Sequence, residues 1–409
     1  MPRKLPAPRI GLALAGGGPL GAIYEIGALC ALDEALVGAE LNDLHAYVGV
    51  SAGGFIAAAL ANGMTPRALC KAFIEDDADA DGDLFRPSLL MRPAWGEFMQ
   101  RAAALPGLSA QAAWQLLFGQ RSLLAAFERL GRALPAGLLS GSAMEARLRK
   151  LFERPGRTND FRQLKRRLVL VATDLDTGEA APFGRPGYDT VPISRAVQAS
   201  AALPGLYAPV EIDGRSYVDG ALKKTLHASV LFDEGVELML CLNPLVPFDA
   251  SRAPHRRVLA GRQTGIPRMV DGGLPTVLSQ TFRSLIHSRL ELGMKSYEAS
   301  HPGIDILLFE ADQRDPEMFL ANTFSLSQRR VLAEHAYQRM RADLRSRRTR
   351  LKATLARHGL ALDAAVLDDP QRRLVRRQPA NTGSPTAQAL RRLQEVLDDL
   401  EHALPAAAR

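Results

Sequence analysis

The chain has 409 residues, of which 47% are apolar and 23% charged, so it is not wholly disordered and can bury a substantial core. The formal net charge is +7, but residues 339 to 377 hold 12 Lys or Arg against 4 Asp or Glu, which leaves −1 for the other 370 residues. The basicity is therefore a property of the C-terminal part. The three cysteines lie in apolar segments without a CxxC pattern, so neither a disulfide framework nor a zinc site is indicated. We expect no other metal site and no cofactor.

The first 63 residues alternate between short apolar runs and helical stretches. We predict strands at 10 to 15 and 46 to 50, and helices at 22 to 35 and 54 to 62, with Gly63 as the cap of the second helix. Such β-α-β-α alternation predicts an α/β fold with a mainly parallel sheet and helices on its faces.

The rest of the chain divides into three parts. Residues 75 to 149 read as a helical insertion broken by prolines. Strands are then predicted at 168 to 173, 216 to 218, 238 to 242 and 304 to 309, with a helix at 193 to 202. A long helix is predicted from Ser325, with Gln328 completing a capping box, to Gly359, followed by a linker at 378 to 386 and a last helix.

Two uncharged stretches resemble targeting or membrane segments. Residues 10 to 24 follow Arg3, Lys4 and Arg9 as in a signal peptide, and residues 46 to 66 are long enough to span a bilayer. Both contain several glycines, which fit strands and turns better than one apolar helix. We therefore expect no transmembrane helix and a cytoplasmic protein rather than a secreted one.

A GxSxG sequence lies between the second strand and the second helix, with Gly49, Ser51 and Gly53 as its fixed positions. A strand that turns abruptly into a helix can hold its apical serine in a strained conformation, with the hydroxyl exposed at the helix N-terminus. The pentapeptide alone fits a catalytic nucleophile and a helix-capping serine equally well.

A glycine loop with Gly16, Gly17, Gly18 and Gly21 lies between the first strand and the first helix, and satisfies GxGxxG. Dinucleotide binding would need an acidic residue at the end of the second strand, where the Ser51 turn lies instead. The other interpretation is an oxyanion hole, in which backbone N–H groups face a tetrahedral intermediate.

A nucleophilic serine needs a base. None of the eight histidines lies in a strand-end loop beside an acid, so a carboxylate is the leading candidate. Asp219 follows a predicted strand and precedes Gly220 and Ala221. Because Gly220 has no side chain, other groups can approach the Asp219 carboxylate closely. Its rivals are interpreted as turn or loop residues: Asp174, Asp176, Asp213 and Asp271.

The glycine loop, the Ser51 turn and the tripeptide Asp219-Gly220-Ala221, in this order, resemble the patatin-like phospholipase family. Residues 172 to 178 and 199 to 204 are similar too, and the resemblance covers about residues 10 to 232. It implies a three-layer α/β/α fold and a lipid acyl ester hydrolase that works through an acyl-serine. Ser51 would be the nucleophile and Asp219 the base. The implied oxyanion hole comprises Gly16, Gly17, Gly18 and Gly21.

The implied organisation is an acyl hydrolase domain at 10 to 232 with its insertion at 75 to 149, further sheet and loops at 233 to 324, and a basic helical extension at 325 to 409. The chain departs from the family pattern at Leu20, where Arg is common, and at Thr225 and His227, where Asn and Pro are usual. His227 therefore stays a candidate for assisting the dyad.

Two surfaces bear on the partners of the chain. The insertion could grip acyl chains or simply pack on the sheet. The basic helix at 339 to 357 fits either a solvated face or peripheral contact with an anionic membrane. Nucleic acid is not expected, because charge alone supports it. The competing functions are acyl transfer by the same acyl-serine and a non-catalytic lipid-binding scaffold.

Overall fold

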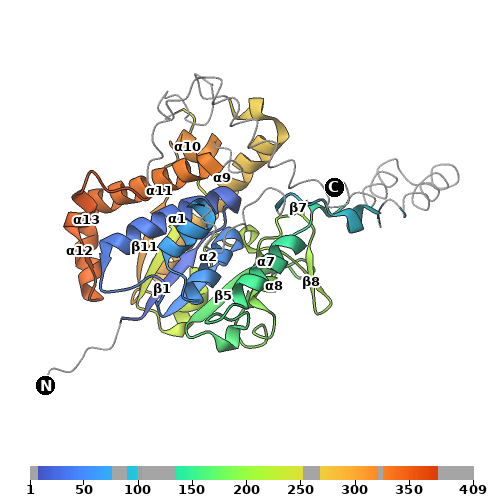
Figure 1. Cartoon of the computed structure of the whole chain (residues 1–409), viewed down its shortest axis with the longest axis horizontal. Helices are drawn as coiled ribbons and strands as arrows, with labels where there is room; N and C mark the ends of the chain where they lie inside the picture. The colour runs from blue at the N-terminus through green and yellow to red at the C-terminus, as the bar shows by residue number, and fades with distance from the viewer. Residues whose placement is uncertain are drawn as a thin grey trace.

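A central sheet runs through the computed structural model, which describes residues 8–75, 90–99, 101, 103, 135–251, 268–320 and 326–375 (Figure 1). Its strands, in spatial order, are β11 (Asp305–Glu310), β10 (Leu238–Asn243), β1 (Ile10–Leu14), β3 (Ala46–Gly49), β5 (Arg167–Asp174), β9 (Arg215–Asp219) and β8 (Val210–Ile212). The five strands from β11 to β5 are parallel. Strands β9 and β8 are antiparallel, as is β6 (Ala180–Phe183), which also pairs with β5. The expected mainly parallel sheet is confirmed.

Helices cover both faces of this sheet. Successive side chains of a strand point to opposite sides, so each buried strand contributes to two cores. Leu12 and Leu14 of β1 lie in the core on the face covered by α1 (Gly18–Ala35), α2 (Ser51–Ala61) and α8 (Ile193–Ser200). Ala13 and Ala15 lie on the other face, in a core with the 3₁₀ segment η4 (Ala228–Glu234) and α9 (Gly273–Ser300). The molecule is therefore a three-layer α/β/α fold.

Helix α11 (Leu326–Ser346) lies along α1 and completes the outer core on that side (Figure 1). The two helices approach closely at Gly27, where a Cβ would lie 2.4 Å from the carbonyl oxygen of Ala333. Ala336, Tyr337 and Met340 of α11 are buried in the same core. The described part of the expected C-terminal extension is thus packed into the body of the fold.

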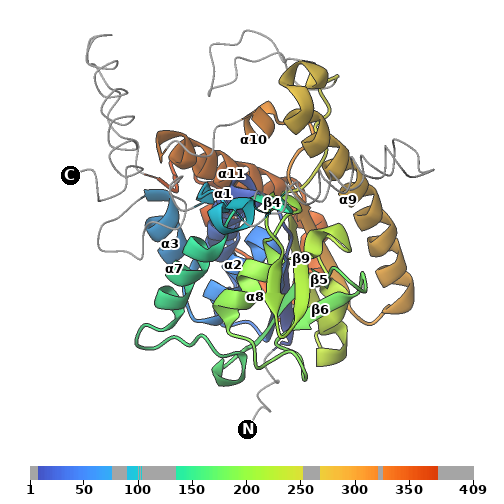
Figure 2. The ribbon, with the colours of Figure 1, turned by 90° about the vertical axis from the view of Figure 1, so that its right-hand side faces the viewer.

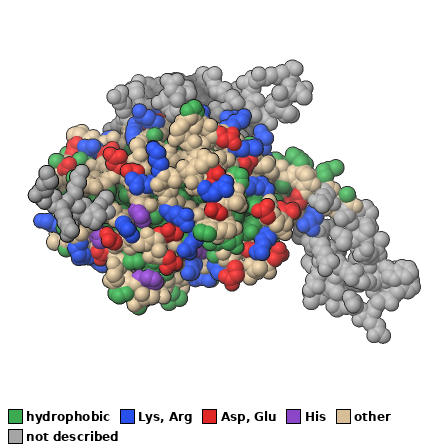
Figure 3. Space-filling model, turned by 90° about the horizontal axis from the view of Figure 1, so that it is seen from below, with side chains coloured by type: hydrophobic (Ala, Val, Ile, Leu, Met, Phe, Trp, Pro, Cys, Tyr) green, Lys and Arg blue, Asp and Glu red, His purple; other side chains and the backbone are tan. Residues whose placement is uncertain are grey.

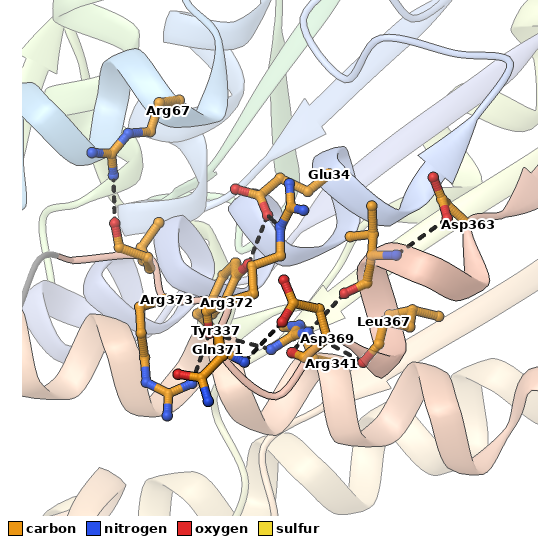
Figure 4. A network of polar contacts seen from close by, with 12 residues as sticks. Glu34, Arg67, Tyr337, Arg341, Asp363, Leu367, Asp369, Gln371, Arg372 and Arg373 are labelled. Atoms are coloured by element: carbon orange, nitrogen blue, oxygen red, sulfur yellow. Dashed lines mark hydrogen bonds and ion pairs between the residues drawn. The ribbon is translucent and has the colours of Figure 1, made fainter.

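The segment after α11 is fastened to α1 by a polar network (Figure 4). It contains α12 (Arg348–Arg357), β12 (Ala361–Leu362), which pairs with β2 (Leu36–Val37), and α13 (Ala364–Asp368). The buried Arg341 guanidinium donates to the carbonyls of Val366, Leu367 and Asp369. Glu34 of α1 accepts from Arg372 and from the Tyr337 hydroxyl, both at 2.6 Å. These bonds hold residues 366–372 against α1 and α11.

The remaining described elements are short: α3 (Pro66–Cys70), the π-helical turn η1 (Lys71–Glu75), α7 (Ser142–Phe152), the 3₁₀ turns η2 (Phe161–Gln163), η3 (Gly220–Leu222) and η5 (Met269–Gly272), α10 (Pro316–Leu320), and β4 (Gly137–Leu139), which pairs with β7 (Gly205–Tyr207).

The strands expected from the sequence are confirmed as β1, β3, β5, β9, β10 and β11. The single helix expected from 325 to 359 is wrong, because Arg347 leaves helical geometry between α11 and α12 and donates to the carbonyl of Leu308. Most of the expected insertion, Ser325 and residues 376–409 lie outside the described residues.

The surface seen from below in Figure 3 carries acidic and basic side chains interspersed with one another. All three cysteines are buried, in agreement with their apolar sequence surroundings. Within the described ranges, no helix combines the length and apolar character needed to cross a membrane.

Candidate active site

Ser51 occupies a sharp turn between β3 and α2. Its backbone φ is 54°, in the left-handed region that L-residues other than Asn and Asp rarely adopt. The turn can form because its flanking glycines approach the backbone closely: a Cβ on Gly53 would lie 2.4 Å from the Ala15 carbonyl oxygen, and one on Gly49 2.5 Å from that of Gly53. The side chain is therefore held at the N-terminus of α2, where the helix favours developing negative charge.

A hydrogen-bonded serine fixes this turn to the sheet. The amide N–H of Ser51 donates to Oγ of Ser200 at 2.8 Å, and that hydroxyl donates to the carbonyl of Val171 in β5 at 2.6 Å. Ser200 is fully buried at the end of α8. It was not a candidate from the sequence, where only the run 199 to 204 stood out as similar to a family.

Asp219 lies at the same level of the sheet as Ser51. Gly49 of β3 is in register with Leu170 of β5, and two residues further along β5 Ala172 is in register with Asp219 of β9. The amide N–H of Ala221 donates to Oδ1 of the Asp219 carboxylate at 2.9 Å, and the Ser51 hydroxyl lies near enough to this carboxylate to lower its pKa. The structure thus brings together two residues that are 168 positions apart.

The Asp219 carboxyl is buried, and its burial raises the pKa to about 6, against the lowering effects of the Ala221 amide and the Ser51 hydroxyl. Gly220 allows this placement, since a Cβ there would lie 2.2 Å from the Val171 carbonyl oxygen. A carboxylate with a pKa near 6 is ionised at neutral pH and is a stronger base than an exposed aspartate.

The glycine loop lies directly beside Ser51 and the loop that carries Asp219. A Cβ built on Gly16 would be 3.1 Å from Cβ of Ser51 and 3.3 Å from Cβ of Ala221. Gly17 and Gly18 form the start of α1, where the first amide N–H groups of a helix have no intrahelical acceptor. The Gly21 amide, in contrast, donates to the Gly17 carbonyl at 2.9 Å, so it is not available to a ligand.

His227 contacts the loop that carries Asp219, and no hydrogen bond joins it to Asp219 or Ser51 in the described structure. Its Nε2 lies 3.2 Å from the carbonyl oxygen of Gly220. Burial lowers the pKa of this histidine to about 4, so the imidazole is neutral at pH 7 and donates to that carbonyl. The arrangement fits a residue that positions the Asp219 loop.

The rival acidic residues have structural roles, as the sequence predicted. Oδ1 of Asp174 accepts from the amides of Asp176 and Thr177 in the turn after β5. Asp213 and Gly214 form the two-residue turn between β8 and β9, both with positive φ. Asp271 lies in the exposed turn η5 before α9.

No group of three or more His, Cys, Asp or Glu side chains in the part of the chain that the structure describes could hold a metal ion. The arrangement around Ser51 consists of a hydroxyl, a buried carboxylate and the amides of a helix start. These groups are suited to nucleophilic attack by serine on an acyl carbonyl.

Comparison with known families agrees with this chemistry. The family described as patatin-like phospholipase matches residues 12–232, just over half of the chain. The chain belongs to the patatin-like phospholipase family. Membership supports lipid hydrolysis as its activity. The matched region of this patatin-like chain includes the glycine loop, Ser51 and Asp219, while β10, β11 and α11 lie beyond it.

Solved structures similar to the patatin-like chain share little sequence with it. VipD from Legionella pneumophila is 17% identical, with a TM-score of 0.36 over 83% of this chain and 67% of VipD. The type III effector ExoU of Pseudomonas aeruginosa is 17% identical, with a TM-score of 0.34 over 84% of this chain and 54% of ExoU. Human GIVD cytosolic phospholipase A2 is 15% identical, with a TM-score of 0.25 over 60% and 42% of the two chains. This chain thus spans about half of ExoU and less of the human enzyme.

Proposed function

We propose that this patatin-like chain hydrolyses the acyl ester bond of phospholipids or lysophospholipids through an acyl-serine intermediate. The observation that carries the proposal is that the Ser51 hydroxyl lies beside the buried Asp219 carboxylate and lowers its pKa. A serine whose hydroxyl lies beside a basic carboxylate can transfer its proton there and act as a nucleophile without a histidine.

In the first half of the reaction, Ser51 Oγ attacks the acyl carbonyl carbon while Asp219 accepts the hydroxyl proton. The resulting oxyanion is stabilised by amide N–H groups at the start of α1, for which we propose those of Gly17 and Gly18. Collapse of the tetrahedral intermediate breaks the ester C–O bond. The proton then passes from Asp219 to the departing alcohol.

In the second half, Asp219 accepts a proton from a water molecule that attacks the acyl-serine. Collapse of this second tetrahedral intermediate releases the fatty acid, and the proton returns to Ser51 Oγ. Asp219 is thus ionised at the start of both halves, which its pKa of about 6 permits at neutral pH. Leu20, in the place where the family commonly has Arg, adds no charge that would hold a phosphate.

The test is covalent labelling with a fluorophosphonate together with hydrolysis of a lipid panel. We expect wild type to be labelled and to release fatty acid, whereas Ser51→Ala is unlabelled and Asp219→Asn loses at least about a thousandfold in kcat/KM. Asp213→Asn, in the hairpin turn next to the β9 strand, is the control and should behave as wild type.

Three outcomes would overturn the proposal. Labelling that survives Ser51→Ala would identify another nucleophile. Absence of both labelling and hydrolysis in wild type would leave a non-catalytic lipid-binding protein. Transfer of the acyl group to an added alcohol or lysolipid, without release of fatty acid, would identify an acyltransferase.

A further inference from the structure

Helix α9 has two apolar faces, of which only one is buried. Ile286 and Leu290 are buried, and Met294 and Tyr297 pack against the core of the sheet. The other face carries large apolar side chains that are exposed to solvent. We call these six residues the outer stripe: Leu274, Val277, Leu278, Phe282, Leu285 and Leu292.

The outer stripe is continuous along the helix. Leu274, Leu278, Leu285 and Leu292 are separated by 4, 7 and 7 positions, which places their side chains within about 40° of one another around the axis. Leu274 and Leu292 are 70% and 67% exposed, so neither end of the stripe is covered. A row of this kind marks a contact surface, because an ordinary surface helix is polar on its outer side.

The inner face of α9 is bonded to the loop that carries Asp219. The Ile286 carbonyl accepts from the Thr225 hydroxyl at 3.2 Å, and the Arg289 guanidinium donates to the Leu222 carbonyl at 3.1 Å. Thr225, which departs from the family pattern, therefore joins the helix to the catalytic loop.

The same face is bonded to the segment that follows β10. Gln280 bonds to both backbone groups of Phe248, and Arg283 donates to the carbonyl of Val246. This segment begins at Pro244, which lies against the glycine loop: a Cβ on Gly17 would be 3.0 Å from its Cγ. The N-terminal half of α9 rises past the ends of the strands, on the side where this loop lies (Figure 2).

Positive charge precedes the outer stripe in the sequence. Residues 252 to 268 contain Arg252, Arg256, Arg257, Arg262 and Arg268, and no Asp or Glu. A stretch of sequence with five arginines and no acidic residue leads into a helix with exposed leucine and phenylalanine. This combination favours binding to anionic lipid surfaces, where apolar insertion and charge attraction act together.

The basic residues 339 to 357, which lie in α11 and α12, are less suited to that role, because many of their cations are bonded within the protein. Arg339 pairs with Asp312 and Asp315, and Arg357 pairs with Asp305. Arg341, Arg347 and Arg348 bond to backbone carbonyls or to carboxylates.

We propose that the outer stripe of α9 is the surface by which the protein docks on an anionic phospholipid bilayer, because the sequence that leads into this helix is basic and would be attracted to such a bilayer. Docking through this face would hold the Asp219 loop, to which α9 is bonded, at the lipid surface, together with the glycine loop, against which Pro244 lies. This use of the surface rests on the proposed hydrolase function, whereas the binding itself does not.

The test is sedimentation of the full chain with two kinds of vesicle, phosphatidylcholine alone and phosphatidylcholine with phosphatidylserine in about a 7:3 ratio. We expect binding to the anionic vesicles that weakens with salt. Leu278→Asp with Leu285→Asp, and separately Arg256→Gln with Arg257→Gln, should each weaken it at least about tenfold. The matched control is Val37→Asp, an exposed apolar residue in β2 that lies outside the surface and should bind as wild type.

Hydrolysis of a water-soluble, monomeric ester separates the two proposals. The stripe variants should keep wild-type kcat/KM on this ester while losing activity on vesicles. Vesicle binding by wild type without hydrolysis of any ester would leave the docking surface standing and refute the hydrolase. Equal binding by wild type and the stripe variants would overturn the docking proposal. So would a wild-type dimer that the stripe variants convert to monomers, because the stripe would then be covered by a second copy of the chain.

Discussion

The Ser200 hydroxyl accepts a hydrogen bond from the amide N–H of Ser51 at 2.8 Å and donates one to the carbonyl of Val171 at 2.6 Å, so a single side chain joins the Ser51 turn to β5. Removing this hydroxyl takes away the hydrogen bonds that it makes to two buried backbone groups, and a buried group left without a partner costs about 1 to 3 kcal/mol. It also releases the turn that holds the proposed nucleophile.

We therefore expect Ser200→Ala to lower both the free energy of unfolding and kcat, the latter by about tenfold or more. Ser194→Ala is the matched control, because Ser194 is equally buried in α8 and its hydroxyl bonds to Glu145. It should lose stability but keep kcat. Denaturant unfolding and ester hydrolysis measure the two effects, and equal kcat losses in both variants would refute the special role of Ser200.

The left-handed backbone of Ser51 predicts an unusual order of stability among its variants. Because φ is 54°, Ser51→Gly should be more stable than Ser51→Ala by about 1 kcal/mol, although both lack the hydroxyl. At the helical position Ser284 the order should reverse, with alanine the more stable by about 1 kcal/mol. Thermal unfolding of the four variants measures this, and the same order at both positions would show that Ser51 is not strained.

The raised pKa of Asp219 predicts where the rate of ester hydrolysis falls on the acid side of the pH–rate profile. The proposed base must be ionised and its pKa is raised to about 6, so kcat/KM on a soluble ester should fall about tenfold per pH unit below pH 6. A rate that stays level down to about pH 4.5 would contradict this role.

The raised pKa of Asp219 also makes the stability of the folded protein depend on pH. A carboxyl whose pKa is raised on folding binds its proton more tightly in the folded state, so it lowers stability as pH rises from about 4 to about 6. The fall in wild-type stability across this window should be smaller in Asp219→Asn.

His227 tests whether a histidine takes part in the chemistry. Its pKa of about 4 and its bond to Gly220 predict a neutral positioning residue. We expect His227→Asn, which suits the left-handed backbone at φ 47°, to keep fluorophosphonate labelling, to retain kcat/KM within about tenfold, and to leave the acid limb near pH 6 unchanged. Loss of labelling in a variant that still folds would replace the Ser/Asp dyad by a Ser–His site.

The burial of the Glu25 carboxyl should lower the stability of the folded protein by an amount that depends on pH. Glu25 is fully buried in α1, neither of its carboxylate oxygens has a hydrogen-bond partner among the described residues, and burial raises its pKa well above 4.5. Because the folded pKa is the higher one, stability falls as pH rises above about 4.5. Glu25→Gln should therefore gain about 1 to 3 kcal/mol over wild type at pH 8, and less at pH 5. A constant difference between the two pH values would refute this.

The sequence could predict those parts of the fold whose signal is local. The six main strands are short apolar runs that end in glycine, aspartate or polar loops, and the Ser51 turn and the Asp219 loop each have their own motif. Placing Ser51 beside Asp219 needed the family resemblance, because the contact depends on the register of β3 and β9 on either side of β5.

Other elements had no local signal. Helix α9 was not predicted, because apolar residues on both of its faces remove the single apolar stripe that identifies a helix. Ser200 resembles any small residue in an alanine-rich run until the fold places it under Ser51. The pairing of β2 with β12 joins residues more than 300 positions apart and leaves no pattern in either dipeptide.

The position of β1 in the sheet has a consequence for synthesis of the protein. Among the strands of this sheet it is translated first, yet one of its neighbours is β10, which begins at Leu238, and the helix that covers α1 begins at Leu326. Until those segments have been translated, the nascent chain carries an unpaired apolar strand edge and an uncovered helix face, which are the features that chaperones bind. Completion of the N-terminal core is therefore a late event in the making of this chain.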